Sequence, residues 1–591
     1  MDAFIDPEIN QLQLLRQEGY NYRERRHEPW RENYTLYRDT VQVNRLTQRQ
    51  SVNMPLMKTA IKTILKDIDD MPIMQFESLD NDKQKELFLN EYWRWTLEMN
   101  KAELFDLVDK KQEGIYGRSF DQMQIGDGRV LLTGVDPEDI YVSRFMDPTN
   151  IDSSRFLLHF NIYEPLSNLE KNPDYDPEKV KELKMWHASE AGLIKNEENR
   201  QALAEKNEKL SDMGLQDVDS PILSEMIVSL EQFFVYDRKD EDSEEELFLK
   251  VLADDHCILL KKPLEEVIGI TKDHYWRTHF PYNSWADDLE RQDFWSDGIA
   301  DIVRTPNKVL NSFYSQLVEN RTLRNFGMHY HKQVEGFSPQ SFQPRPWGFY
   351  GIPAGPQEKI EDVIQKVDIP DLSESLDEME YIVQMVEKAS GATSTQQGAV
   401  EQRKITLGEV QLALGEAKER IKGISKFYTQ VWKERAEKFL KLIEASPDKL
   451  DAVKLYKKGL NNDKLYMREV APSDWHSKTG YVVRIWSRDE KNNRDADAIE
   501  KTNAVKNSMP DNPKVDDIFK RRLLEFAEFT PDEVNEALQF ERDKREQMQK
   551  MAELTAQMGG MPGATPLPPG MPGTPAQPQQ PVLPAQNNRL Q

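Results

Sequence analysis

The sequence predicts an α+β, mostly helical protein that is divided into several parts. The chain has 591 residues, and this length predicts about four domains or sub-domains. Apolar residues at helical spacing dominate both halves of the chain, whereas short alternating runs between Gly- and Pro-containing turns occupy the region after residue 118. Charged residues make up 31% and hydrophobic residues 38% of the chain, a balance that favours many helices around modest cores.

Composition also limits the partners and the compartment. The formal net charge is -25, and such a surface repels nucleic acid in bulk, so a contact with DNA would be local or loose. Cys257 is the single cysteine; it permits no disulfide within the chain, which fits a reducing cytoplasm, and its apolar neighbours in "DDHCILL" predict a buried structural thiol. The start "MDAFIDPEIN" does not resemble a signal peptide, and no apolar run is long enough to span a bilayer.

Residues 31–124 read as helices separated by turns. In "NMPLMKTAIKTILKDI" the apolar residues recur at four-residue steps on one face, at Leu56, Ala60, Ile64 and Ile68. Gly117 is a plausible end of the last of these helices. The following "SFDQMQIGDGRVLLTGV" places Gly-Asp-Gly between alternating apolar residues, which predicts a β-hairpin.

The next segments alternate between strands and polar helices. "VDPEDIYVSRFMDPTN" and "RFLLHFNIYEP" each predict a strand, and residues 174–220 predict charged, peripheral helices. "MIVSLEQFFVYDRKDEDSEEELFLKVLADDHCILL" returns to strands around an acidic turn at residues 237–246. We interpret that turn as a solvated hairpin tip, with a cation site as the less favoured alternative.

From residue 297 the chain is helical again, with one interruption. Thr305-Pro306 indicates either a kink or an N-cap with proline at the first helical position. The stretch "FGMHYHKQVEGFSPQSFQPRPWGFYGIPAGP" is dense in Pro, Gly and aromatic residues and predicts a small non-helical insertion. A helix resumes in "SESLDEMEYIVQMVEKAS", and the polar loop "SGATSTQQGAVEQRK" follows it. A polar loop of this length between rigid elements is usually either disordered or placed to touch something.

The longest predicted helix covers residues 405–445. Its apolar residues step alternately by three and four, in the manner of a heptad seam: Leu407, Val410, Leu414, Ala417, Ile421, Ile424, Tyr428 and Val431. The seam is buried either against its own domain or between subunits. "SKTGYVVRIWSRDEKNNRDA" then predicts a strand, and Thr530-Pro531 begins one of the closing helices. From about residue 558 the Gly-, Pro- and Gln-rich chain is expected to be disordered.

No pattern specifies a catalytic centre. The chain lacks GxxxxGK[ST], GxGxxG after a strand, HExxH, GxSxG and CxxC. His329 and His331 would share one face of a strand, but without a nearby acidic or thiol partner they fit an ordinary polar pair better than a metal site. The sequence therefore argues against an enzyme, and we expect no cofactor and no nucleotide hydrolysis.

The order of these segments resembles that of the portal, or head-to-tail connector, proteins of tailed bacteriophages. "WRENYTLYRD", "EGIYGRSFDQMQ", "VDPEDIYVSRFMDPTN", "SDGIADIVRTPNKVLNSFYSQLVENRTLRN" and "SGATSTQQGAVEQRKITLGEV" all look like portal segments in portal order. The resemblance covers roughly residues 30–545 and depends on the shared order of individually loose stretches. It implies an α/β wing, a helical stem, a small α/β clip, a long bent helix and a helical crown.

Carried over by position, the resemblance implies the following boundaries. The N-terminal region and wing cover 1–296, the first stem helix 297–325, the clip 326–369, the second stem helix 370–390, the tunnel loop 391–404, the long wing helix 405–445, the wing return 446–512, the crown 513–557 and the disordered tail 558–591.

The resemblance further implies a ring of twelve copies at one capsid vertex of the virion, assembled in the host cytoplasm. Double-stranded DNA would pass through its channel without sequence specificity. The implied partners are the large terminase subunit, head-to-tail adaptor or tail proteins, and the major capsid and scaffolding proteins, with no membrane.

Two sets of candidate site residues follow from the resemblance. The tunnel loop would offer DNA neutral hydrogen-bonding groups from Thr393, Ser394, Thr395, Gln396 and Gln397. Arg403 and Lys404 are two nearby cations, and their simpler interpretation is as surface charges at the start of a helix. The clip would present aromatic anchors to docking partners, although some of these rings would fill a local core: Tyr330, Phe337, Phe342, Trp347, Phe349 and Tyr350.

Two other classes of protein remain as alternatives. A non-viral coiled-coil scaffold would use the seam from Leu407 to Val431 as its dimer interface and would form a small, elongated oligomer. A metal-dependent packaging nuclease would cleave DNA with magnesium through a few of the abundant carboxylates.

Overall fold

The structure is a computed structural model of the chain. It describes residues 6–39, 43–44, 49–50, 53–68, 71–80, 82–213, 226–239, 244–289, 293–326, 329–331, 359, 364–368, 375–390, 407–458, 465–477, 479–486, 497, 500–501, 503–504, 513–526 and 531–558. The chain separates into two compact units, residues 1–494 and 495–591, and each is described by itself.

The first unit begins with helices around one early strand. The elements are α1 (Pro7–Arg38), the short strands β1 (Val43–Asn44) and β2 (Arg49–Gln50), α2 (Leu56–Asp67), β3 (Ile73–Ser78), α3 (Lys83–Met99) and α4 (Ala102–Tyr116). Asp6 caps α1 by accepting a hydrogen bond from the Glu8 backbone N–H over 3.0 Å. Gly117 ends α4 with a left-handed φ of 78°, as predicted.

The prediction of helices throughout residues 31–124 is wrong at β3. This strand pairs antiparallel with β16 (Tyr481–Trp486), starting from the pair Ser78 and Tyr481. Its partner is about 400 residues away in the sequence, so no local pattern could reveal the pairing. The residues before and after β3 have helical spacing, which favoured a helix here as well. Along β3 itself, buried and less buried residues alternate.

The predicted hairpin is confirmed in β4 (Ser119–Gly126) and β5 (Arg129–Val135). Asp127 and Gly128 form its two-residue turn with φ values of 52° and 71°, the positive angles that a type I′ hairpin needs. The strand β11 (Tyr282–Trp285) pairs with β4 and completes a three-stranded sheet.

A five-stranded antiparallel sheet has the order β10-β9-β8-β7-β6. Its strands are β6 (Ile140–Val142), β7 (Phe156–Pro165), β8 (Ile227–Asp237), β9 (Glu246–Ala253) and β10 (Cys257–Pro263), with the short helices α5 (Leu166–Leu169) and α8 (Leu264–Ile268) beside it. The strands predicted from the sequence in these segments are confirmed. Asp237 pairs with Glu246, so the acidic turn closes a hairpin as predicted, and residues 240–243 within it lie outside the described residues.

The helices α6 (Pro177–His187) and α7 (Glu190–Met213) are less peripheral than their charge suggests. Asp254, in the turn between β9 and β10, accepts hydrogen bonds from His187 Nε2 over 2.9 Å and from Asn199 Nδ2 over 2.8 Å. Both donors are buried. Cys257 is also buried, as predicted, and burial raises the pKa of its thiol to about 12.

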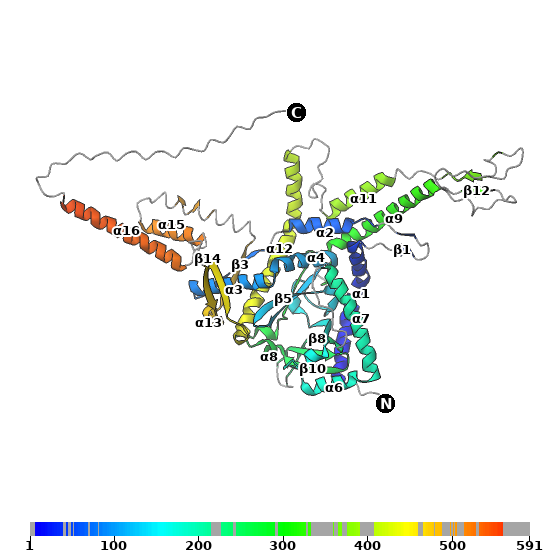
Figure 1. Cartoon of the computed structure of the whole chain (residues 1–591), viewed down its shortest axis with the longest axis horizontal. Helices are drawn as coiled ribbons and strands as arrows, with labels where there is room; N and C mark the ends of the chain where they lie inside the picture. The colour runs from blue at the N-terminus through cyan, green and yellow to red at the C-terminus, as the bar shows by residue number, and fades with distance from the viewer. Residues whose placement is uncertain are drawn as a thin grey trace, which may run out of the picture. The chain divides into compact units, whose positions relative to one another are not determined.

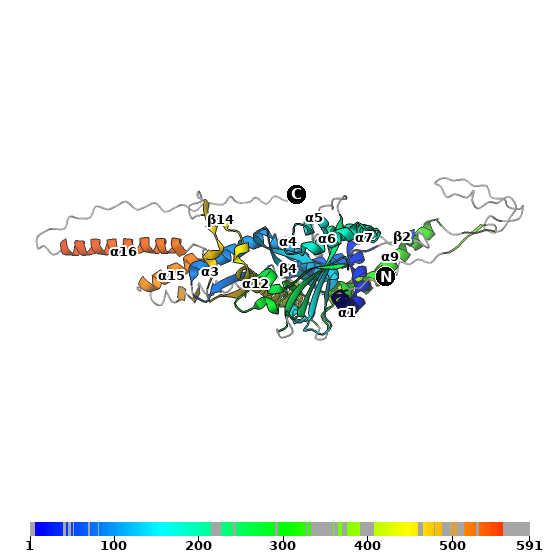
Figure 2. The same cartoon turned by 90° about the horizontal axis from the view of Figure 1, so that it is seen from below.

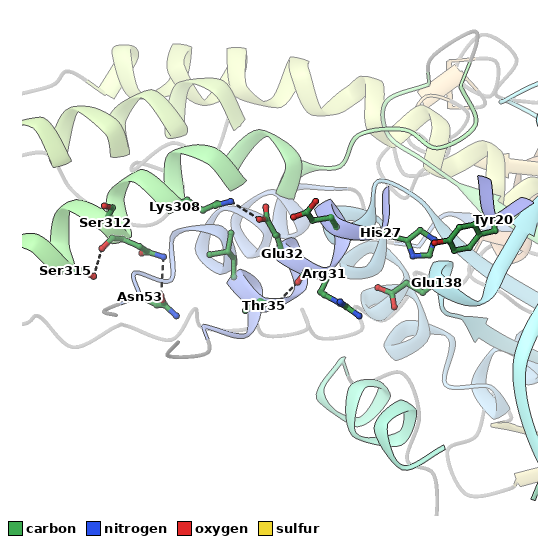
Figure 3. A pocket seen from close by; sticks show the side chains of 13 residues that line it. Tyr20, His27, Arg31, Glu32, Thr35, Asn53, Glu138, Lys308, Ser312 and Ser315 are labelled. Carbon is green, nitrogen blue, oxygen red and sulfur yellow. Dashed lines mark hydrogen bonds and ion pairs between the residues drawn. The ribbon is translucent and has the colours of Figure 1, made fainter. Parts of the chain in front are cut away.

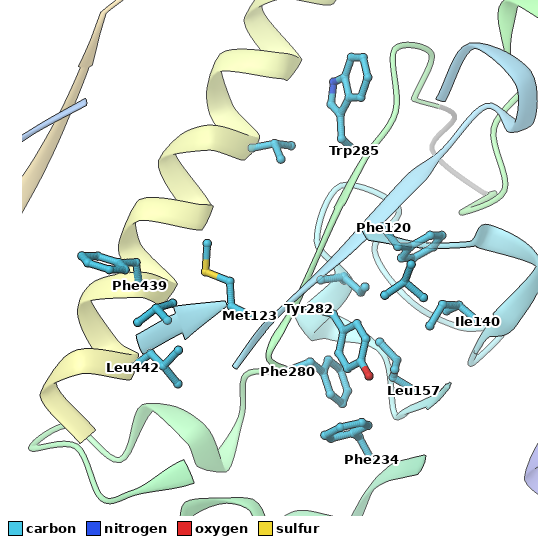
Figure 4. Packing of buried hydrophobic residues seen from close by; sticks show 14 of the residues in the cluster. Phe120, Met123, Ile140, Leu157, Phe234, Phe280, Tyr282, Trp285, Phe439 and Leu442 are labelled. Atoms are coloured by element: carbon cyan, nitrogen blue, oxygen red, sulfur yellow. The ribbon is translucent and has the colours of Figure 1, made fainter. Parts of the chain in front are cut away.

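The core consists of layers that follow one another from α12 (Leu407–Ala445) to α1. The strands of the three-stranded and five-stranded sheets lie between α12 on one side and α1 on the other (Figure 2). Met123 of β4 lies beside α12, and Tyr282 of β11 lies toward Leu157 of the five-stranded sheet (Figure 4). The Phe439 ring of α12 packs against Phe76 of β3 and Trp93 of α3. The opposite face of that sheet packs against α1 in a separate cluster of Ile9, Leu12, Tyr141, Phe156, Leu158, Phe233, Val235 and Leu252.

Buried polar contacts also fix α1 to the body. Arg23 is 2% exposed, and its Nη1 donates to the carbonyl oxygens of Pro137, Glu138 and Ile140 over 2.9, 2.7 and 2.8 Å. The guanidinium lies 4.2 Å from the centre of the Tyr141 ring. Further along α1, Asn33 Nδ2 donates to the Ile115 carbonyl over 3.1 Å.

Two long helices follow the sheets. α9 (Ile299–Phe326) continues through Pro306, so the alternative in which a helix begins at that proline is wrong. α11 (Ser375–Ser390) packs beside α9 (Figure 1). The strands β12 (His329–His331) and β13 (Ile364–Lys366) come between these helices in the sequence and pair with each other antiparallel.

The last elements of the first unit include two strands that the sequence pattern did not predict. They are β14 (Val453–Lys458) and β15 (Leu465–Val470), a separate antiparallel pair, followed by the short α13 (Pro472–Trp475). The strand predicted in "SKTGYVVRIWSRDE" is confirmed as β16. Throughout the described residues, no helix has both the length and the apolar character needed to cross a membrane.

The second unit contains α15 (Pro513–Phe526) and α16 (Pro531–Met558), which pack together. Arg545 lies 3.1 Å from Asp516 and 3.0 Å from Asp517, so ion pairs connect the two helices. α16 begins at Pro531, as predicted from Thr530-Pro531. The predicted disordered tail lies outside the described residues after Met558.

Candidate functional site

Most of the predicted site residues lie outside the described part of the chain. This holds for the whole tunnel-loop set, Thr393, Ser394, Thr395, Gln396, Gln397, Arg403 and Lys404, and for Phe337, Phe342, Trp347, Phe349 and Tyr350 of the clip set. Tyr330 is placed in β12, opposite Gln365 of β13. The elements that flank both segments are described.

The flanking strands hold the two ends of the aromatic insertion together. β12 begins three residues after the end of α9, and β13 precedes α11. Their register pairs His329 with Lys366 and His331 with Ile364. The insertion therefore leaves from and returns to one two-stranded ladder next to the paired helices α9 and α11.

Arg435 anchors the C-terminal half of α12 in the body. Its Nη2 lies 2.8 Å from Asp109 Oδ2 of α4 and 2.7 Å from Asp121 Oδ1 of β4, and its Nε donates to the same Asp121 oxygen over 2.9 Å. All three side chains are at most 2% exposed. Burial alone would lower the pKa of Arg435, but the two carboxylates outweigh it and raise the pKa.

A second buried group lies one to two turns earlier along α12. Asp106 of α4 accepts hydrogen bonds from the Tyr428 hydroxyl and, over 3.2 Å, from Trp432 Nε1. Lys110 Nζ lies 2.8 Å from the other Asp106 oxygen, and this pair is also buried. One turn of α12 after Arg435, Lys438 Nζ lies 3.1 Å from Asp152 Oδ2.

These contacts divide α12 into an anchored part and the part nearest the polar loop. Tyr428 and Val431 are buried within their own unit, so at this end the predicted seam packs against its own domain. The side chains of the seam from Leu407 to Ile424 lie outside the described residues. Since α11 ends at Ser390 and α12 begins at Leu407, the predicted tunnel loop connects α11 to a helix that is fixed at its far end.

The sequence reasoning missed this anchor, although a signal was present. Arg435 continues the three-and-four spacing of Tyr428 and Val431, so a charged residue occupies a position of the apolar face. A buried charge needs a partner, but the sequence alone did not indicate Asp109 and Asp121, which lie more than 300 residues earlier.

Two carboxyl groups meet near the start of α9. Glu113 Oε1 accepts a hydrogen bond from the Asp287 backbone N–H over 3.2 Å, and Glu113 is 0% exposed. Burial, and then the neighbouring Asp287, raise the pKa of Glu113 well above its ordinary value. Burial likewise raises the pKa of Asp287. Burial therefore favours the neutral, protonated form of these carboxyl groups.

A groove of about 920 Å³ runs between α1 and α9 (Figure 3). Lys308 of α9 lies 2.8 Å from Glu32 of α1 across it. Further lining residues are Tyr20, His27, Arg31, Thr35, Ser312 and Ser315. In the part of the chain that the structure describes, no group of His, Cys, Asp and Glu side chains could hold a metal ion.

The described geometry defines a subunit with an α/β body, a pair of long helices that lead into a small insertion, and a long helix fixed in the body. The sequence matches the family described as phage SU10 portal protein over residues 43–517. The chain belongs to this family and is a portal protein of a tailed bacteriophage, the head–tail connector of the capsid. No curated protein matches the chain.

Proposed function

We propose that this portal protein assembles into a ring of twelve copies at one vertex of the capsid. Its central channel passes double-stranded DNA during packaging and ejection. The observation that carries the proposal is the placement of the polar segment 391–404 between α11 and an α12 whose C-terminal half is fixed by Arg435. A polar segment that is joined to a firmly anchored helix suits contact with a moving duplex.

Weak contacts suit the passage of DNA. The net charge of -25 per chain repels phosphate, so an acidic wall discourages sticking. In the loop, Thr395, Gln396 and Gln397 can exchange hydrogen bonds with phosphates without the salt-dependent grip of Lys or Arg. Arg403 and Lys404 precede α12 in the sequence, and a surface role is the simpler interpretation of their charges.

Negative-stain images and mass photometry of the purified protein test the ring. We expect hollow rings with the mass of about a dozen chains, because a family of head–tail connectors must surround the DNA. Particles limited to monomers and dimers across a wide concentration range would contradict the ring and favour a coiled-coil scaffold.

A deletion of Thr395–Gly398 tests the DNA role of the loop. The segment has no apolar residue, so its removal should cost little folding stability and should leave ring assembly intact. We expect impaired packaging or retention of DNA in virions that carry the deletion. Full-length genomes packaged at the normal rate and held under pressure would instead indicate a plain connector.

The insertion between β12 and β13 is proposed as the docking surface for the large terminase subunit and later for an adaptor or tail protein. Its aromatic residues lie among Pro and Gly, which favours fixed loops with exposed anchors. Trp347→Ala and Tyr350→Ala should weaken partner binding while rings still form. Unchanged binding by both variants would refute the docking role.

The nuclease alternative receives less support. Catalysis of that kind needs clustered carboxylates that hold a metal, whereas the buried Asp106 and Asp109 of α4 pair with Lys110 and Arg435. Magnesium-dependent DNA cleavage that follows the protein through stringent purification would overturn this view.

A further inference from the structure

One face of α9 is apolar and exposed in the single chain. Ile302 and Val309 are 48% and 39% exposed, and Pro306 and Phe313 on the same face are half-buried. Successive residues advance by about 100° around a helix, which places all four within about 40° of Ile302. We name these four residues the apolar stripe. No described residue of α9 after Leu310 is buried, so this part of the helix has room for a partner.

A different face of α9 forms a wall of the groove beside α1. Lys308, Asn311, Ser312 and Ser315 line the groove from α9, and the same spacing centres them about 140° from the centre of the apolar stripe. The groove is an open depression lined by five charged residues. Glu32 pairs with Lys308 over 2.8 Å, Glu138 pairs with Lys209 over 2.7 Å, and Glu28 and Arg31 are exposed. An apolar occupant therefore leaves Glu32, Lys308 and Glu138 with their partners.

The positions of the apolar stripe and of the groove wall along α9 indicate which partner can fill the groove. The apolar stripe covers residues 302–313, and the groove wall covers residues 308–315. A rotation about a ring axis keeps every residue at its own height along that axis, so the complementary faces of neighbouring subunits must overlap in height. A ring interface must also join two different faces, because a shared face would give a closed two-fold dimer.

We infer that the groove between α1 and α9 receives the apolar stripe on α9 of a second copy of this chain, so that neighbouring stems interlock around the ring. The inference rests on the proposed ring and identifies the two surfaces that join its subunits. One wall comes from α1, Pro7–Arg38, which lies before the family match that begins at residue 43. The α1 wall thus lies outside the matched region, whereas both faces of α9 lie within it.

Paired cysteines test the contact. The native Cys257 is buried, so introduced cysteines will be the reactive ones. Arg31→Cys places a thiol on the α1 wall of the groove, and Val309→Cys places one on the apolar stripe; both native side chains are exposed. In the full-length protein that carries both changes, a short bis-maleimide should link successive copies into a ladder that reaches the size of the ring. Each single variant should remain unlinked, because the two faces are different.

A matched control separates this contact from the other exposed face of the stem. Tyr381 of α11 is 63% exposed, and Tyr381→Cys combined with Arg31→Cys should give no ladder. A ladder with Tyr381→Cys and none with Val309→Cys would show that α11 fills the groove and would overturn the inference. Dimers from either single variant would also overturn it, because they indicate a two-fold interface.

Failure of the inference is distinguishable from failure of the ring. If negative-stain images show rings of the unmodified protein and of the double variant but no ladder forms, the interface is wrong and the proposed ring stands. If no rings form at any concentration, the proposed function fails first. Ile302→Glu with Val309→Glu gives a second readout: we expect at least a tenfold loss of rings in favour of monomers, against little change for Tyr381→Glu. Rings at the normal yield in the doubly charged variant would also contradict the inference.

Discussion

Arg435 of α12 lies 2.7 Å from Asp121 of β4, and the two side chains are 1% and 0% exposed. Asp109 completes the group at 2.8 Å. The arrangement makes the anchor of the long helix sensitive to the loss of one partner, since a buried charge that loses its counter-charge is strongly destabilising.

Arg435→Ala should therefore destabilise the first unit by about 3–5 kcal/mol, because it leaves two buried carboxylates without their cation. Lys433→Ala is the control, since the Lys433 pair with Glu437 is 3.7 Å long and largely exposed and should change stability by at most about 1 kcal/mol. Thermal unfolding followed by tryptophan fluorescence measures both. Equal melting temperatures of the two variants would contradict the anchor.

The Glu113–Asp287 pair predicts a loss of stability with rising pH. The pKa of Glu113 is raised in the folded protein, so the folded state binds more protons than the unfolded state above the ordinary pKa. The stability that the pair contributes is complete below that value and is lost as the pH rises through the folded pKa. Each unit of pKa shift corresponds to about 1.4 kcal/mol.

Glu113→Gln should remove part of that dependence, because the neutral amide can still accept from the Asp287 N–H. Relative to the native protein, we expect the variant to be more stable at pH 8 than near pH 4. Glu103→Gln, an exposed position on the same helix, is the control. Parallel pH profiles for native protein and Glu113→Gln would refute the raised pKa of Glu113.

In the Asp127–Gly128 turn, Gly128→Ala should lower stability both by backbone strain and by a steric clash. Gly128 has a φ of +71°, and a Cβ there would lie 2.1 Å from Asp451 Oδ2. Gly480 has a φ of +94° with nothing within 4 Å of such a Cβ. Both substitutions by Ala carry a backbone strain of about 1–2 kcal/mol, but Gly128→Ala must also displace Asp451. Its melting temperature should be the lower one, and the reverse order would contradict this contact.

The buried guanidinium of Arg23 predicts how firmly α1 is held. Arg23→Met removes the donor to three carbonyl oxygens, each of which forms a hydrogen bond to a charged group worth about 1.5–3 kcal/mol. Limited proteolysis with subtilisin should therefore release α1 at least tenfold faster than from the native protein. Arg25→Met is the control, because Arg25 is 56% exposed. Equal release rates from both variants would indicate that the apolar contacts of α1 suffice.

The sequence predicted well what depends on local pattern. The hairpin at Asp127-Gly128, the helix end at Gly117 and the start of α16 at Pro531 each follow from the backbone preference of one or two residues. The sequence pattern gave wrong predictions where contacts with distant segments determine the secondary structure. β3 exists because β16 pairs with it, and Pro306 lies inside a helix because its surroundings support α9.

The same division applies to the candidate site. The order of segments predicted the family, since order survives when individual residues vary. Arg435, Asp109 and Asp121 were not predicted as a group, because a charged residue on an apolar face does not say which partners it meets. The groove between α1 and α9 likewise depends on residues about 280 positions apart, such as Glu32 and Lys308.

The pairing of β3 with β16 has a consequence for folding during synthesis on the ribosome. About 400 residues separate Ser78 from Tyr481, and at 5–20 residues per second a ribosome needs roughly 20–80 s to synthesise them. For most of that interval Phe76 also lacks its neighbour Phe439, whose ring centre lies 6.0 Å from that of Phe76 in the finished fold. The body can close only when most of the chain has left the ribosome, so β3 remains without its partner strand on the nascent chain until synthesis is nearly complete.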